Sequence, residues 1–268
     1  MNKRLIVTIM LGKDPSYHFV KKAFKAYANK VDADFVCMTK HSGDYDFVSK
    51  KNSVFLKAIF EKLNLEKYLR YYERVLYLDA DILITPAARD VFDVYDDPRF
   101  VYMLDEGVIS CRRRELDLIS ERLEKPIIEP HYYNAGVILI SRESGFLGVI
   151  DGDALKFFTK NSNFPEQTYM HFSFLKNASR IKSLLPEFNR MGISGDGDGD
   201  GDGDGDGDGD GDLRLLASFI HYAGHSYCRK KDRAKTIMRD YCRLYHYTPM
   251  LAERVHYLLG TLRSKLKI

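Results

Sequence analysis

The chain alternates between short continuous runs of apolar residues and longer stretches in which apolar residues recur at helical spacing. The continuous runs predict buried β-strands, and they cover residues 5–10, 33–38, 74–78, 100–104 and 135–140. Helical spacing covers residues 17–30 and 52–65. Because strands and helices alternate, we expect an α/β fold with a mostly parallel central sheet that helices flank on both faces.

The strand predicted at 74–78 runs directly into Asp79 and Asp81, within the segment YERVLYLDADILIT. In such sheets ligands bind at the carboxyl ends of the strands. Two carboxylates one residue apart can converge on one hard cation, Mn²⁺ or Mg²⁺, which would neutralise charge on a leaving diphosphate. A surface turn with two solvated acids is the alternative, and the apolar residues on both sides favour the metal site.

The composition suits one globular domain with a small appendage, since 45% of the 268 residues are hydrophobic. Cys37, Cys111, Cys228 and Cys242 form no CxxC pair, so we expect reduced thiols and no zinc site. The first apolar run is too short for a signal peptide, and no stretch approaches the ~20 apolar residues of a membrane span. We therefore expect a cytoplasmic location, which would be the host cytoplasm for a viral protein.

The net charge of +3 conceals two opposed parts. Residues 195–212 are nine Gly-Asp dipeptides, and their nine negative charges leave +12 on the rest of the chain. A basic body suits anionic ligands such as nucleotide diphosphates, nucleic acid or an acidic membrane. The Gly-Asp run has no apolar side chain, which predicts a disordered surface insertion. A calcium-binding loop is the less favoured alternative, because such loops also need apolar positions.

Four further segments, in chain order, accompany the Asp-x-Asp strand. They are YYNAGVILIS at 132–141, PEQTYMHF at 165–172, LPEFN at 185–189 and FIHYAGHSY at 219–227. Together the five segments resemble glycosyltransferase family 8, the GT-A group that includes glycogenin and bacterial galactosyltransferases. The resemblance covers about residues 4–228, and compact glycosyltransferases of large algal viruses are similar more loosely.

The resemblance implies a GT-A fold, with a catalytic domain at 1–228 and a basic helical extension at 229–268. It implies an enzyme of glycan biosynthesis that moves a sugar from a nucleotide-diphosphate donor, a UDP-sugar, to a hydroxyl acceptor such as a glycan, with retention of configuration. It assigns Mn²⁺ or Mg²⁺ to Asp79, Asp81 and His221. It assigns donor binding to Lys57, Asn134, Ala135, Gly136, Gly224 and Asp79, and catalysis to Glu166, Gln167 and Asp105.

Physical chemistry supports some of these implied roles and leaves others open. A neutral imidazole is a suitable ligand for manganese, although His221 without its motif would be interpreted as a core or surface histidine. Gly224 lacks a Cβ and so would let backbone approach the diphosphate. Lys57 would lie near the Asp-x-Asp segment or the phosphates, and a solvated helix lysine is an equal alternative.

The sequence also departs from the family pattern. Ser226, Tyr227 and Cys228 stand where the family has Lys-Pro-Trp, so the lysine that contacts the diphosphate is missing, and Lys230 or Lys231 would replace it. Glu166 stands in place of aspartate, which moves the carboxylate by one methylene, about 1.5 Å. The donor sugar and the stereochemical course therefore stay open.

Residues 229–268 are basic and rich in tyrosine, and Pro249 divides them into two predicted helices. A packed helix with a solvated basic face is the favoured interpretation. Peripheral contact with an acidic membrane is the alternative. We expect no nucleic-acid partner, because no motif for reading bases accompanies the basic residues.

Two other functions compete with sugar transfer. A phosphohydrolase of the haloacid dehalogenase type also places Asp-x-Asp after an apolar strand and uses the first aspartate as a nucleophile. That group needs Thr or Val two residues after the second aspartate, where this chain has Leu83. The second alternative is a protein that binds a nucleotide sugar without transferring it.

Overall fold

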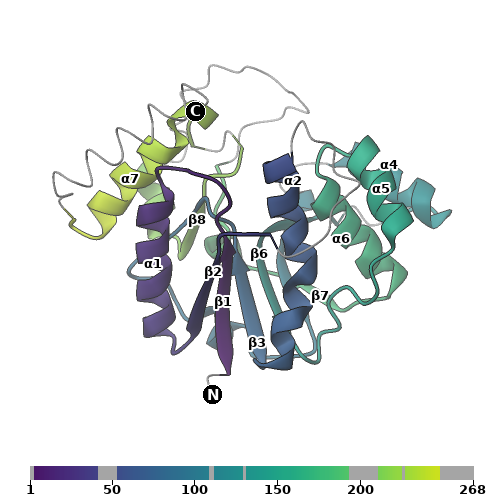
Figure 1. The fold of residues 1–268 in the computed structure, drawn as a ribbon, viewed down its shortest axis with the longest axis horizontal. Helices are drawn as coiled ribbons and strands as arrows, with labels where there is room; N and C mark the ends of the chain where they lie inside the picture. Colours follow the sequence, from purple (N-terminus) through teal and green to yellow (C-terminus); the bar gives the residue numbers. More distant parts are fainter. Residues whose placement is uncertain are drawn as a thin grey trace.

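The computed structural model describes residues 3–41, 53–108, 112–128, 131–192, 211–224 and 227–247. Its main feature is a six-stranded sheet with the strand order β2-β1-β3-β6-β5-β7 (Figure 1). The strands are β1 (Arg4–Ile9), β2 (Asp34–Met38), β3 (Arg74–Leu78), β5 (Val101–Asp105), β6 (Tyr133–Ser141) and β7 (Ile181–Ser183). Two further strands, β4 (Ile82–Ile84) and β8 (Phe219–His221), form a separate antiparallel pair.

The predicted α/β class with a mostly parallel sheet is confirmed, with one antiparallel strand. β1 pairs in parallel with β2 and β3, and β5 pairs in parallel with β7. β6 runs antiparallel to both of its neighbours, β3 and β5. The amino end of β6 therefore lies at the same edge of the sheet as the carboxyl ends of β1, β3 and β5.

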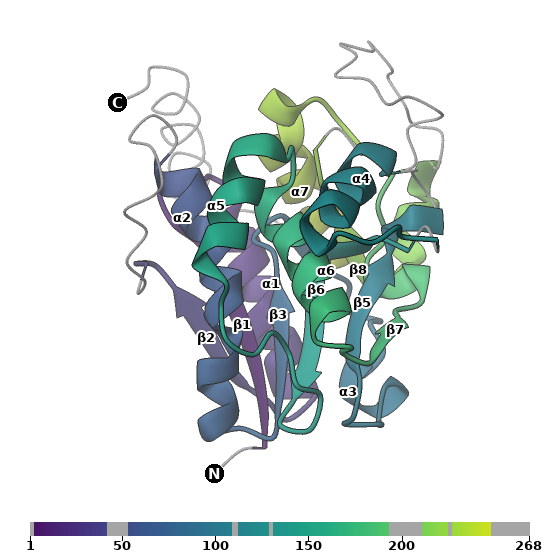
Figure 2. The same cartoon turned by 90° about the vertical axis from the view of Figure 1, so that its right-hand side faces the viewer.

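Helices cover both faces of the sheet. They are α1 (Tyr17–Lys30), α2 (Ser53–Phe60), α3 (Val91–Val94), α4 (Arg113–Leu123), α5 (Gly152–Asn161), α6 (Pro165–Lys176) and α7 (Arg233–Leu244). Figures 1 and 2 show α1 and α7 on one face, with α2, α4, α5 and α6 on the other. The predicted bounds of the helix at 17–30 and of the strand at 74–78 are confirmed without a shift.

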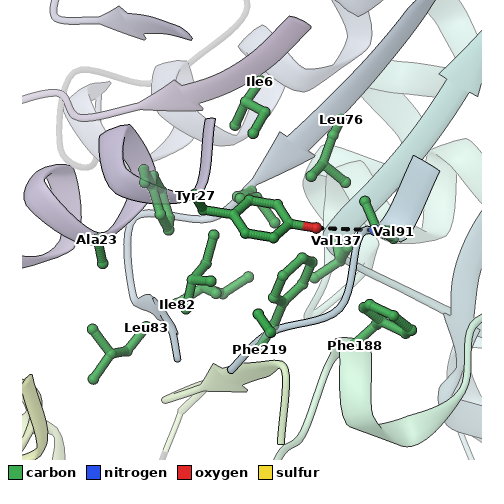
Figure 3. Close-up of a cluster of buried hydrophobic side chains, with 14 of the residues drawn as sticks. Ile6, Ala23, Tyr27, Leu76, Ile82, Leu83, Val91, Val137, Phe188 and Phe219 are labelled. Carbon is green, nitrogen blue, oxygen red and sulfur yellow. Dashed lines mark hydrogen bonds between the residues drawn. The ribbon is translucent and has the colours of Figure 1, made fainter. Parts of the chain in front are cut away.

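The alternation of side chains along β1 divides the core into two clusters. Ile6 belongs to the cluster that contains α1 and α7, whereas Leu5 and Val7 belong to the cluster that contains α5 and α6. Successive side chains of a strand point to opposite faces of its sheet, so both faces of β1 are buried. In the first cluster the hydroxyl of Tyr27 accepts a hydrogen bond from the backbone N–H of Val91 at 2.9 Å (Figure 3).

The helix predicted at 52–65 changes its winding partway along. α2 ends at Phe60, and a 3₁₀ helix follows over Glu61–Arg70. In a 3₁₀ helix the side chains at positions i and i+3 eclipse one another, so Lys62 and Leu65 share one buried face. Lys62 is therefore a charged residue on the buried side of this segment, beside the apolar Leu63 and Leu65.

The basic segment after residue 228 begins as an amphipathic helix. Ile237 and Tyr241 of α7 join the core cluster that contains α1, while Lys235, Arg239 and Arg243 are exposed. Asp240 is buried and accepts hydrogen bonds from the Tyr222 hydroxyl at 2.8 Å and from the Arg214 guanidinium at 3.1 Å. The packed helix with a basic outer face is thus confirmed for α7.

Several predictions fall outside the described residues. They concern the second C-terminal helix after Pro249, nearly all of the Gly-Asp insertion, Cys111 and Ser226. The domain boundary at residue 228 stays a prediction. Among the helices that the structure describes, none has the length and apolar character needed to span a bilayer.

Candidate active site

The turn between β3 and β4 places the Asp-x-Asp pair at the edge of the sheet. The backbone N–H of Asp79 donates to the Gly136 carbonyl of β6 at 2.8 Å, and the N–H of Ile82 returns to the Asp79 carbonyl at 3.1 Å. β4 then pairs with β8 in a register that sets Ile82 opposite His221. A strand late in the chain therefore delivers the histidine to the two aspartates.

Asp79, Asp81 and His221 form a group that could hold a metal ion. One ligand atom from each residue lies within 4.8 Å of the other two. The Nε2 atom of His221 is 3.4 Å from Asp81 Oδ1 and 4.0 Å from Asp79 Oδ2. Two carboxylates and an imidazole are a donor set that suits Mn²⁺, and Mg²⁺ through the carboxylates.

Hydrogen bonds fix which nitrogen of His221 faces the aspartates. The amide nitrogen of Asn189 donates to Asn134 Oδ1 at 2.9 Å, so its amide oxygen is left to accept. That oxygen is 2.8 Å from His221 Nδ1, which therefore carries the ring proton. The lone pair of Nε2 then points to the aspartates, as a metal ligand requires.

Gly136 makes room for the imidazole of His221. A Cβ at this position would lie 2.2 Å from His221 Cε1 and 2.9 Å from Asn134 Oδ1. The residue was predicted to face the donor sugar, a role that stays a prediction. The structure adds a reason for glycine that the motif alone does not give: the histidine approaches too closely for any side chain.

Lys62 reaches Asp79, the first aspartate of the pair. Its buried ammonium is 2.9 Å from Asp79 Oδ1 and 3.3 Å from both Glu166 Oε1 and the Ala135 carbonyl. Burial opposes the charge, but the two carboxylates outweigh it and raise the pKa of Lys62. Lys57, which the sequence analysis proposed, is half-buried on α2, and its donor-binding role stays a prediction.

Asp81 has cationic and imidazole partners on its two oxygens. Arg233, the first residue of α7, lies 2.8 Å from Oδ2, while Oδ1 faces His221. Lys230 and Lys231, the predicted substitutes for the missing family lysine, are exposed. Arg233 was not among the residues predicted for the site.

Glu166 and Gln167 lie together at the start of α6, where Pro165 begins the helix. The side chain of Gln167 accepts from the Ala135 N–H at 3.0 Å and donates to Glu106 Oε2 at 3.1 Å. Glu166 pairs with Lys62. The structure thus brings Gln167 into contact with Ala135 of β6 and joins Glu166 to the same site through Lys62.

Glu106 is a further site residue that the sequence analysis missed. It is buried, and its Oε2 also accepts from Asn134 Nδ2 at 3.1 Å, while its Oε1 pairs with Arg112. It directly follows Asp105 at the carboxyl end of β5. A second pair of acids at a strand end was thus visible in the sequence, although adjacent side chains, unlike those of Asp79 and Asp81, tend to point to opposite faces.

The other predicted residues take different places. Asp105 is buried and accepts hydrogen bonds from the backbone N–H groups of Gly107 and Tyr132, at 2.9 and 3.1 Å. Gly224 is exposed and adopts the left-handed conformation, with φ at 55°, which favours glycine. Its contact with a diphosphate stays a prediction.

An α/β sheet with an Asp-x-Asp turn at its edge, joined by a histidine from β8, is the arrangement expected of a glycosyltransferase of the GT-A class. The model of glycosyl transferase family 8 matches residues 13–248. The chain therefore belongs to glycosyl transferase family 8, and the resemblance drawn from five motifs is confirmed.

Individual relatives are distant. A Haemophilus influenzae protein provisionally named a glycosyltransferase is 29% identical over 118 residues, which are 43% of this chain and 32% of that protein. The match thus spans about a third of the length of this curated relative.

Two solved structures share the fold. A glycosyltransferase involved in glycosylation of the major capsid of PBCV-1 superposes with a TM-score of 0.54 at 12% identity, covering 88% of this chain and 98% of that chain. The galactosyltransferase LgtC, in complex with donor and acceptor sugar analogs, gives 0.52 at 15% identity, covering 94% and 99%. At these identities the likeness establishes the GT-A fold alone.

Proposed function

We propose that this protein transfers a sugar from a UDP-sugar to a hydroxyl group of a glycan, with a divalent cation, Mn²⁺ or Mg²⁺, at Asp79, Asp81 and His221. The observation that carries the proposal is the convergence of these three ligands at the carboxyl edge of the sheet. The orientation of His221 by Asn189 and the space left by Gly136 make the set fit a cation. A bound cation would supply charge neutralisation to the diphosphate.

The charges around the site support an anionic ligand. Asp79, Asp81 and Glu166 contribute three negative charges, while Lys62 and Arg233 contribute two positive ones. A divalent cation would turn the resulting net charge of −1 into +1, which suits a diphosphate. Without Arg233 the loaded group would be neutral. We therefore assign to Arg233 the contact that the absent family lysine would make.

The chemical step that we propose is based on the positions of these residues. The bond between the anomeric carbon and the diphosphate oxygen breaks, and the acceptor oxygen forms a new bond to that carbon. The acceptor proton passes to the departing diphosphate, so that UDP and the glycoside are the products. In this proposal Glu166, which pairs with Lys62, would stabilise positive charge on the sugar ring in the transition state. Attack from the face of the leaving group would retain the configuration.

Titration with nucleotides tests the proposal. We expect UDP to bind in the presence of Mn²⁺, to bind better than GDP or CDP, and to lose most of its affinity in Asp81→Ala. Asp117→Ala, which removes an exposed acid on α4, is the matched control and should bind like the wild type. Absence of nucleotide binding in the wild-type protein under every condition would refute the proposal.

Two further expectations remain proposals. The exposed basic residues of α7, Lys235, Arg239 and Arg243, support peripheral contact with an acidic membrane. Co-sedimentation with vesicles that contain phosphatidylserine tests this contact, and equal sedimentation with neutral vesicles would contradict an electrostatic origin. A cytoplasmic location and the absence of a nucleic-acid partner also stay predictions.

A further inference from the structure

A buried tyrosine two residues before the Asp-x-Asp pair is hydrogen-bonded to the first aspartate. Alternate side chains of a strand lie on the same face of its sheet, so Tyr77 of β3 can reach the side chain of Asp79. Tyr77 is only 1% exposed, and it belongs to the core cluster that contains α5 and α6. Its hydroxyl donates to Asp79 Oδ1 at 2.5 Å. The strand thus brings a hydrogen-bond donor to one of the three residues of the cation site.

The partners of Asp79 make its two carboxylate oxygens unequal. Each oxygen of an ionised carboxylate can accept about two hydrogen bonds. Oδ1 accepts from Tyr77 and lies 2.9 Å from the ammonium of Lys62, so both of its positions are filled. Oδ2 accepts from Lys62 at 3.1 Å and lies 4.0 Å from His221 Nε2. Within the described part of the chain, Asp79 therefore keeps one lone pair for a cation, on Oδ2.

Asp81 shows the same division between its two oxygens. Its Oδ2 accepts from the guanidinium of Arg233 at 2.8 Å, whereas its Oδ1 lies 3.4 Å from His221 Nε2. Each aspartate therefore turns one oxygen to the imidazole and the other to a protein donor. The three residues together would offer a cation two single carboxylate oxygens and one nitrogen.

Such a set of ligands favours a transition-metal ion over Ca²⁺. Ca²⁺ takes about six to eight oxygen ligands, and it often binds both oxygens of one carboxylate. A nitrogen ligand does not suit it, whereas an imidazole is a common ligand of first-row transition metals. An aspartate that can offer only one oxygen therefore disfavours Ca²⁺ more than it disfavours Mn²⁺.

We propose that Tyr77 selects the cation, because its hydroxyl fills Oδ1 of Asp79 and so prevents this carboxylate from binding Ca²⁺ through both oxygens. Tyr77 is a positioning residue, since it acts on the cation through Asp79. A phenylalanine would fill the same space in the core, so packing does not require the hydroxyl. The inference rests on the proposed function and adds to it a preference for Mn²⁺ over Ca²⁺, together with the residue that sets this preference.

Cation binding to the variant Tyr77→Phe tests the inference without turnover. The variant loses the hydroxyl and keeps the ring, whose centroid lies 5.4 Å from the ammonium of Lys62. Tyr27→Phe is the matched control, because its hydroxyl is also buried and donates to the Arg89 carbonyl at 2.8 Å. Electron paramagnetic resonance gives the Kd of Mn²⁺ for each protein in the presence of UDP, and displacement by Ca²⁺ gives the Kd of Ca²⁺. Urea unfolding checks that each variant is folded.

We expect the wild-type protein to bind Mn²⁺ more tightly than Ca²⁺. The ratio of the Ca²⁺ Kd to the Mn²⁺ Kd should fall about tenfold in Tyr77→Phe, the effect expected for one hydrogen bond to a charged group. In Tyr27→Phe the ratio should stay within about twofold of the wild type, because this tyrosine does not contact the site. If Tyr77 served only the packing of the core, its variant would weaken the binding of both cations by the same factor and leave the ratio unchanged.

Three outcomes would overturn the inference. The first is a ratio in Tyr77→Phe that lies within about twofold of the wild-type ratio. The second is an equal fall of the ratio in Tyr27→Phe, and the third is tighter binding of Ca²⁺ than of Mn²⁺ by the wild type, which needs no variant. Failure of the wild type to bind Mn²⁺ with or without UDP would instead overturn the proposed function, and this inference with it.

Discussion

Replacing Gly136 by alanine tests whether the close approach of His221 to β6 builds the metal site. The added Cβ would lie 2.2 Å from His221 Cε1 and 2.7 Å from Nδ1, closer than such atoms can approach. The ring cannot retreat without breaking its 2.8 Å hydrogen bond to Asn189, which is fully buried. The overlap must therefore displace the ligand itself.

The expected effects are on stability and on metal affinity. Overpacking a buried site costs about 1–3 kcal/mol of unfolding free energy. A displaced ligand costs about 10- to 100-fold in metal affinity, the range found when the groups that orient a metal ligand are removed. Gly152→Ala is the control, because a Cβ there meets nothing within 4 Å and the residue begins α5.

Urea unfolding measures the first effect, and calorimetric titration with Mn²⁺ measures the second. Gly152→Ala should unfold at the same urea concentration as the wild type or slightly higher. Wild-type Mn²⁺ affinity in Gly136→Ala would refute the reasoning, because His221 would then not be a ligand held at that place. A loss of stability with unchanged affinity would point to packing alone.

Three further results are expected. Asn189→Ala should weaken Mn²⁺ binding about 10- to 100-fold, because His221 loses the partner that fixes its tautomer, and unchanged calorimetric affinity would contradict this. Arg233→Gln should reduce the ratio of UDP affinity to UMP affinity, whereas Lys230→Gln should not. Equal ratios in the two variants would show that Arg233 does not contact the diphosphate. Because burial lowers the folded pKa of His171 from 6.5 to about 4, the unfolded chain binds its proton first on acidification. Stability should therefore fall by up to about 3 kcal/mol between pH 7 and pH 4, and His171→Phe should reduce this fall in urea unfolding; an unchanged pH dependence would contradict the buried-neutral assignment.

The hydrophobic pattern was sufficient to predict the helices and strands whose buried residues follow one regular spacing. The amphipathic spacing of α1 and the continuous apolar run of β3 specified both elements without a change of bounds. The direction of β6 was beyond such patterns, because an apolar strand buried on both faces has the same composition in either orientation. The pairing of β4 with β8 joins segments far apart in the sequence, and only the family motif connected His221 to Asp81.

Site residues that belong to a motif could be predicted from the sequence. Site residues that reach the aspartates through tertiary contacts could not. Lys62 lies on the apolar face of the predicted helix, at helical spacing from Phe55 and Ile59, but its ion pair with Asp79 depends on a tertiary contact that the spacing does not contain. Arg233 reaches Asp81 because α7 packs against α1, a tertiary contact that no short pattern contains. Asn189 lay in a quoted motif, but its role appears only from the tautomer that it imposes.

The β4–β8 ribbon has a consequence for how the protein responds to its cation. A metal bound by both Asp81 and His221 would join the two strands, so that β8 could not open without releasing the ion. Binding to the folded state alone adds about 2.7 kcal/mol at a metal concentration 100 times Kd. Amide hydrogen exchange in β8 should therefore slow when the metal is added. Exchange in β8 would thus measure the occupancy of the cation site at the turn between β3 and β4, although the two segments are far apart in the sequence.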